Sequence, residues 1–319
     1  PLITYPAPTE IYTLTHSSAA SDVYKRQIST SSLGDGTAGN ITVDSGKTLD
    51  MSNSSITSRA EGAGNGGLIS VAVADSIDIS SNSSISASSL GDGTAGNISV
   101  DTGNTLDMNS SSITSKAEGA GDGGDITVTA SSAANIANNS IISASSLGDG
   151  TAGSISLDAG STLGMNSSSI TSEAEGAGDG GDISVVAASA ITMANDSNIS
   201  ASSLGDGLAG NISIDAGKTF NMTDSSITTQ AVVSDGGDIT LVATDMIYLD
   251  QSEITTSVES GVGGGGNIDI DPEFVILKQS NILANAFGGP GGNINIVAGN
   301  FIATPDSSVD ASSALGIDG

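Results

Sequence analysis

The chain has 319 residues and a formal net charge of -29, since 36 Asp and Glu stand against 7 Lys and Arg. This acidic excess argues against nucleic acid and anionic membrane surfaces as partners, because like charges repel. With no Cys and a single His, His16, the chain lacks the residues for disulfides, a zinc site or a catalytic triad.

Residues 1–27 differ in composition from everything that follows. They hold three of the four Tyr, three of the six Pro and the only His. The run SSAASDVYKRQ, at residues 17–27, resembles a translated sequencing adapter, so we predict that this segment is mostly not native sequence. It has no basic stretch followed by an apolar one, so we do not expect a signal peptide here. No run of about 18 apolar residues occurs anywhere, so we expect no membrane-spanning helix.

Residues 28–319 form one repeat domain. The segment SSLGDG returns at a constant spacing of 57 residues, with Leu33, Leu90, Leu147 and Leu204 at its centre. Self-similarity at a fixed period indicates a solenoid rather than a series of globular domains, because each repeat packs only on its neighbours.

A half period divides each 57-residue unit into two coils. An I-x-[VIL] run follows every Gly-rich loop, at steps of 28 and 29 residues that later drift to 26 or 27. Ten such runs predict about ten coils. They begin at Ile41, Ile69, Ile98, Ile126, Ile155, Ile183, Ile212, Ile239, Ile268 and Ile294.

Each coil carries three short runs in which every second residue is apolar. In the first complete coil these are ITV at 41–43, TLDM at 48–51 and SSITS at 54–58. Alternation of this kind is typical of strands with one face inward, and no stretch shows a helical period. The pattern therefore predicts an all-β parallel β-helix (solenoid) of coils of 28–29 residues with three short strands each. Neighbouring coils would be about 4.8 Å apart, which makes a rod of roughly 50 Å.

The connections are rich in turn residues. Asn or Asp with Ser precedes the third strand, as at Asn53-Ser54 and Asn82-Ser83, and repetition predicts polar ladders along the rod. The long loops, SSLGDGTAG and AEGAG in alternate coils, are expected to use their glycines for positive φ angles at sharp corners.

Three segments resemble the repeats of filamentous-haemagglutinin-like exoproteins of cyanobacterial type, which are secreted by the two-partner route. They are GGDITVTA at 123–130, NILANAFGGPGGNI at 281–294 and GGNINIVAGNFIATPDSSVDASSALGIDG at 291–319. The resemblance implies a right-handed β-helix, an outer-membrane secretion partner, and a place outside or on the surface of a Gram-negative-type bacterium. No Asn-Pro pair occurs, so the family's N-terminal secretion domain is absent and only its repeat region is represented.

Two sets of acidic residues recur in the long loops. They are Asp35, Asp92, Asp149 and Asp206 in one set of coils, and Glu61, Glu118 and Glu175 in the coils between. Stacked loops would place carboxylates at regular intervals, and Ca²⁺ prefers several such oxygen ligands. The alternative is a solvated charged edge that discourages lateral aggregation. We interpret a second set as turn residues after the first strand: Asp44, Asp101, Asp158, Asp215 and Asp271.

The function predicted from these patterns is a non-catalytic shaft or adhesin that meets surface glycans or proteins through its repeated loops and needs no cofactor. One alternative is a polysaccharide-active enzyme, but catalysis needs a singular constellation and the carboxylates recur uniformly. A calcium-binding surface repeat protein is another alternative. An ice-binding face would need a flat array of Thr, and in the sequence the Thr residues scatter among Ser, Asp and Asn.

Overall fold

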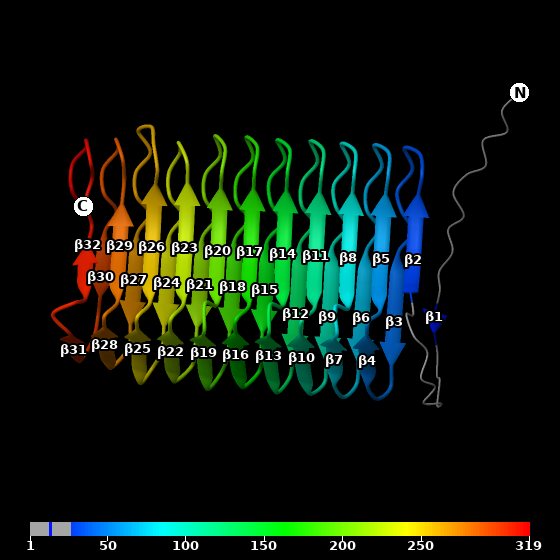
Figure 1. The fold of residues 1–319 in the computed structure, drawn as a ribbon, viewed down its shortest axis with the longest axis horizontal. Coiled ribbons are helices and arrows are strands. Elements are labelled where there is room, and N and C mark those ends of the chain that lie inside the picture. The colour runs from blue at the N-terminus through cyan, green and yellow to red at the C-terminus, as the bar shows by residue number, and fades with distance from the viewer. Residues whose placement is uncertain (1–12, 15–26) are drawn as a thin grey trace, which may run out of the picture.

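The computed structural model describes residues 13–14 and 27–319. Throughout these residues the chain is all-β, and its strands form three parallel sheets that run the length of the molecule (Figure 1). Each coil passes through sheet 1, sheet 2 and sheet 3 in turn, so consecutive strands of one sheet belong to successive coils. The predicted parallel solenoid of about ten coils with three strands each is confirmed.

Sheet 1 contains β1 (Thr13–Leu14), β3 (Ile41–Ser45), β6 (Ile69–Val73), β9 (Ile98–Thr102), β12 (Ile126–Ala130), β15 (Ile155–Asp158), β18 (Ile183–Val186), β21 (Ile212–Asp215), β24 (Ile239–Val242), β27 (Ile268–Asp271) and β30 (Ile294–Ile296). Sheet 2 contains β4 (Leu49–Ser52), β7 (Ile77–Ser80), β10 (Thr105–Asn109), β13 (Ala133–Ala137), β16 (Thr162–Asn166), β19 (Ala190–Ala194), β22 (Thr219–Thr223), β25 (Met246–Asp250), β28 (Phe274–Lys278) and β31 (Asn300–Ala303). Sheet 3 contains β2 (Gln27–Ser32), β5 (Ser55–Ala60), β8 (Ser84–Ser89), β11 (Ser112–Ala117), β14 (Ile141–Ser146), β17 (Ser169–Ala174), β20 (Asn198–Ser203), β23 (Ser226–Ala231), β26 (Glu253–Val258), β29 (Asn281–Asn285) and β32 (Ser308–Asp310).

The core is a set of apolar columns that run along the axis. Isoleucine pairs with isoleucine from coil to coil in sheet 3, for example Ile56 with Ile85 and Ile85 with Ile113. The column comprises Ile56, Ile85, Ile113, Ile142, Ile170, Ile199, Ile227, Ile254 and Ile282, none of which is more than 2% exposed. Burial of each such side chain contributes on the order of 2 kcal/mol, and only stacked coils achieve it.

A serine ladder lines the turn before sheet 3, as the sequence predicted. The Ser83 hydroxyl donates to the Ser80 carbonyl at 2.6 Å and accepts the Ser54 backbone N–H at 3.1 Å. Equivalent bonds tie Ser197 to Ser225, Ser225 to Ser252, Ser252 to Ser280, and Ser280 to Ser307. Positive φ angles fall on neighbours of these serines, such as Asn53 and Asn82, with φ of 49° and 60°.

The long loops stack along one edge, at the top of Figure 1. The prediction that their glycines supply positive φ angles is wrong for nearly all of them, since among described residues Gly160, Gly217 and Gly261 are the glycines with positive φ. The loops approach one another so closely that a side chain would meet the backbone of the preceding coil.

The prediction about residues 1–27 lies almost wholly outside the described residues. Of this segment the structure places Thr13–Leu14, which pair in parallel with Thr42 and Val43 of β3, and Gln27, which begins β2.

Candidate functional site

The predicted Asp column lies in the stacked loops, and its carboxylates bind backbone. Each accepts the N–H of an Ala one coil further on: Asp35 from Ala63 at 3.2 Å, Asp92 from Ala120 at 3.3 Å, and Asp149 from Ala177 at 3.3 Å. At Asp206 the backbone carbonyl takes part instead, accepting the Ser234 hydroxyl at 2.6 Å. Because an Ala coil separates successive Asp residues, the carboxylates lie about 9.6 Å apart along the axis, two strand spacings.

The predicted Glu column is a different column. The Leu90 N–H bonds to the Ala60 carbonyl and the Glu118 N–H to the Ser89 carbonyl, both at 2.9 Å, which places each Glu in register with the Leu of SSLGDG. Glu61, Glu118 and Glu175 therefore precede the Asp register by two positions. Among the described residues no group of three Asp, Glu or His side chains is arranged to hold a metal ion.

The Glu side chains face long polar residues at the end of sheet 3. Arg59 pairs with Glu61 at 3.9 Å, and Lys116 pairs with Glu118 at 3.6 Å. In the next equivalent coil Glu173 occupies the basic position. Partial burial raises the pKa of Glu173, and the nearby Glu175 carboxylate raises it further. Two coils of this edge therefore hold an ion pair and the third holds a repulsive pair.

The second Asp set follows the strands of sheet 1, and part of it behaves as turn residues. The Asp158 carboxylate accepts the Gly160 N–H and that of Asp215 accepts the Gly217 N–H, each at 2.9 Å. Both glycines have positive φ, 61° and 62°. The turn interpretation is confirmed at these two positions.

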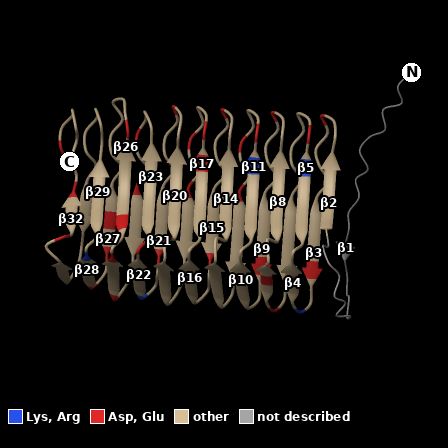
Figure 2. Cartoon of the chain, viewed as in Figure 1, with Lys and Arg blue, Asp and Glu red and all other residues tan. Residues whose placement is uncertain are grey.

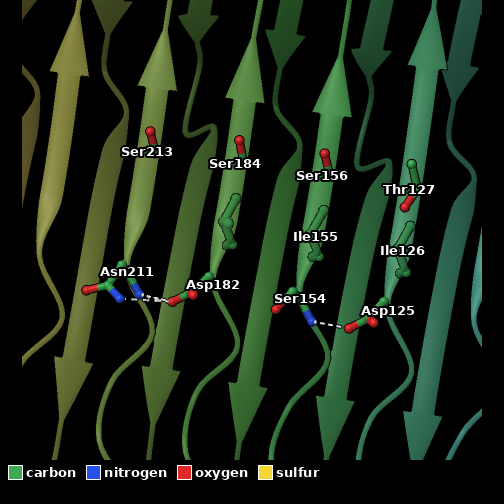
Figure 3. A pocket seen from close by; sticks show the side chains of 11 residues that line it. Asp125, Ile126, Thr127, Ser154, Ile155, Ser156, Asp182, Ser184, Asn211 and Ser213 are labelled. Atoms are coloured by element: carbon green, nitrogen blue, oxygen red, sulfur yellow. Dashed lines mark hydrogen bonds between the residues drawn. The ribbon is translucent and has the colours of Figure 1, made fainter.

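Our sequence analysis did not single out a ladder of Asn and Asp at the start of sheet 1. The Asn97 carbonyl accepts the Asp125 N–H at 2.9 Å, and the Asp182 carboxylate accepts the Asn211 N–H at 2.8 Å. These side chains and the outward Ser and Thr of β12 to β21 line an open groove (Figure 3). The signal was available, because an Asn or Asp precedes most of the Ile anchors.

One cluster breaks the repeat. On the outer face of sheet 2, the Tyr248 hydroxyl and the Lys278 ammonium both donate to Oδ2 of Asp250, at 3.1 and 2.8 Å. The bond from Lys278 lowers the pKa of Asp250, against the opposing effect of burial, while the same carboxylate raises the pKa values of Tyr248 and Lys278. This contact ties β25 to β28.

These features define the class of the protein: a parallel β-solenoid whose polar side chains chiefly tie coil to coil. No protein-family model, curated protein or solved structure matches the chain. The described residues include no helix long and apolar enough to cross a membrane.

Proposed function

We propose that residues 28–319 are a shaft segment of a secreted or cell-surface exoprotein of the filamentous-haemagglutinin-like, two-partner-secretion type. The observation that supports this proposal most is the unbroken parallel pairing of sheet 1 from β3 to β30, together with its counterparts in sheets 2 and 3. A solenoid of this kind resists bending, because each coil is hydrogen-bonded to the next on three sides. Its mechanical task would be to hold a binding end away from the cell.

The shaft is non-catalytic in this proposal. The polar positions of the loop edge recur from coil to coil, and the Asp35, Asp92 and Asp149 carboxylates are engaged by backbone N–H groups. Catalysis needs a nucleophile, a base and an oxyanion site in one place, which a uniform edge does not assemble. The Tyr248–Asp250–Lys278 cluster is singular, and its two donors share one carboxylate oxygen.

Partners follow from the same geometry. An outer-membrane transporter would export the chain, and the stacked loops would meet surface glycans or proteins through many weak, equally spaced contacts. Figure 2 shows acidic side chains gathered in these loops. The loops therefore favour neutral or basic partners.

An export experiment tests this proposal. The chain is fused behind the secretion domain of a two-partner exoprotein and expressed in a Gram-negative host, with and without the matching transporter. Protease-accessible chain on the cell surface only with the transporter is the expected result, whereas retention in the periplasm with the transporter present would contradict it. The purified chain is also incubated with polysaccharides, and any cleavage that Asp250→Asn abolishes would overturn the non-catalytic assignment.

A further inference from the structure

The outward face of sheet 3 carries hydroxyl groups in register. The central outward position is Ser or Thr in nine successive strands, from β2 to β26. The column is Ser29, Thr57, Ser86, Thr114, Ser143, Thr171, Ser200, Thr228 and Thr255. Thr residues that look scattered in the sequence therefore lie side by side in the fold, which removes the reason for setting an ice-binding face aside.

A second column runs beside the first, two residues earlier in each strand. It contains Ser55, Ser84, Ser112, Ile141, Ser169, Asn198 and Ser226. We call these two columns, from β5 to β23, the hydroxyl face. Its side chains are spaced about 4.8 Å along the axis and about 6.7 Å across the strands, as set by strand separation and the two-residue repeat.

The hydroxyl face is uncharged on a strongly acidic protein. Neither column contains Asp, Glu, Lys or Arg between Ser55 and Thr228, although the chain as a whole has a net charge of -29. Figure 2 shows the strands of sheet 3 almost free of charge, with acidic groups concentrated in the loops. The charged side chains nearest to it are Arg59, Lys116 and Glu173, in a third column toward the loop edge. This distribution fits an uncharged partner, because every contact with it avoids desolvating an ion.

Most hydroxyls of the central column are available to a partner. Within the described residues, Thr114 donates to Ser86 at 3.2 Å and Ser200 bonds Ser202 at 2.8 Å. Thr57, Ser143, Thr171 and Thr228 make no comparable bond with other described side chains or with backbone. The sheet holds these groups in place, so ordering them costs little entropy on binding.

The occupant must offer hydrogen-bonding groups on a flat lattice of similar period. The surface of ice does so, since its oxygen atoms repeat at spacings close to those of the hydroxyl face, and small hydroxyl groups hold first-shell waters without displacing them. A sugar chain would gain most from aromatic side chains that cover its ring faces, and neither column contains one. We propose that the hydroxyl face binds ice.

Purified full-length chain is tested for inhibition of ice recrystallisation and for enrichment in a slowly grown ice hemisphere. We expect the chain to slow crystal coarsening and to concentrate in the ice. The double variant Thr114→Tyr, Thr171→Tyr places two large rings on the hydroxyl face and should weaken the effect at least tenfold. Thr127→Tyr, which points outward from sheet 1 into the groove of Figure 3, should leave it unchanged.

Exclusion of the wild-type chain from ice, or equal activity of the face variant and the wild type, would overturn the inference. Equal losses in the face and groove variants would do so as well. Melting curves check folding, and Thr114→Lys with Thr171→Lys is the second face variant should the tyrosines unfold the chain. Binding of ice is independent of the proposed export route, since the purified chain is used, so each proposal fails without the other.

Discussion

The backbone carbonyl of Gly93 lies against Gly121, one coil further on, so closely that a Cβ on Gly121 would fall less than 3.0 Å from it. The same restriction applies along the whole column of Gly64, Gly93, Gly121, Gly150, Gly178 and Gly207. Loop glycines in this protein are therefore required by the close stacking of successive loops.

Replacement of Gly121 by Ala should destabilise the fold. The added methyl group must push two loops apart, an overpacking strain of about 1–3 kcal/mol, and the midpoint of urea unfolding should fall accordingly. Gly46→Ala is the matched control, because a Cβ there meets nothing within 4 Å, and it should change stability by less than about 0.5 kcal/mol. Equal effects of the two substitutions would contradict the stacking argument.

Ser115→Ala should also lower the free energy of unfolding. The buried Ser115 hydroxyl donates to the Gly96 carbonyl at 2.9 Å and accepts the Gly124 N–H at 3.0 Å. Removal leaves a buried N–H unpaired, at a cost of about 1–3 kcal/mol. Ser112→Ala, on the outward side of the same strand, should be nearly neutral in the same urea titration. A neutral Ser115→Ala would show that the hydroxyl bridge is dispensable.

Glu173→Lys should stabilise the chain at neutral pH. A carboxyl whose pKa is raised by folding, as burial and Glu175 raise that of Glu173, is unfavourable once pH rises through that pKa and harmless below its unfolded value. Lysine at this position would instead pair with Glu175, as Lys116 pairs with Glu118 at 3.6 Å. The gain at pH 7 should stay under about 1 kcal/mol, because the pair is partly exposed.

The pH dependence of melting checks this prediction. At pH 3 both carboxylates are protonated in the wild type, so the advantage of Glu173→Lys should disappear. Lys116→Glu serves as the converse variant, since it creates the repulsive pair in a second coil and should lower the melting temperature at pH 7. A pH-independent gain would point to helpful packing by the lysine stem.

The Asp250–Lys278 pair should make a pH-dependent contribution to stability. Its hydrogen bond to Lys278 lowers the pKa of Asp250 below 3.8, so the benefit is present above that value and is lost as pH falls through the lowered pKa. Lys278→Met should therefore reduce the melting temperature at pH 7 and match the wild type near pH 2. Lys47→Met removes a lysine that has no ion-pair partner within the described residues and should have no such profile.

Calcium should have no specific effect on the loop edge. The Asp carboxylates lie two coils apart and the Glu column is two positions out of register with them, so no set of six to eight oxygens converges. We expect calorimetry to show no saturable heat with Ca²⁺, and melting temperature to respond alike to Ca²⁺ and Mg²⁺. Saturable binding that Asp92→Asn removes would restore the calcium hypothesis.

The sequence by itself determined the solenoid. A fixed spacing and a two-residue apolar alternation are properties of the chain alone, so the coil number, the strand positions and the Ile columns follow from them. The serine ladder before sheet 3 was predictable for the same reason. Asp158 and Asp215 were recognisable as turn residues from their place after a strand.

Only the tertiary structure decided which loop residues stack on which. Glu61 and Asp92 belong to similar loops, yet inter-coil hydrogen bonds set Glu61 beside Leu90, so the candidate acidic residues form two columns and no metal cluster. The same register gathers Thr57, Thr114 and Thr171 into one uncharged column. The physical reason is that coil lengths vary between 26 and 29 residues. Alignment across coils therefore depends on backbone pairing, which residue spacing alone does not specify.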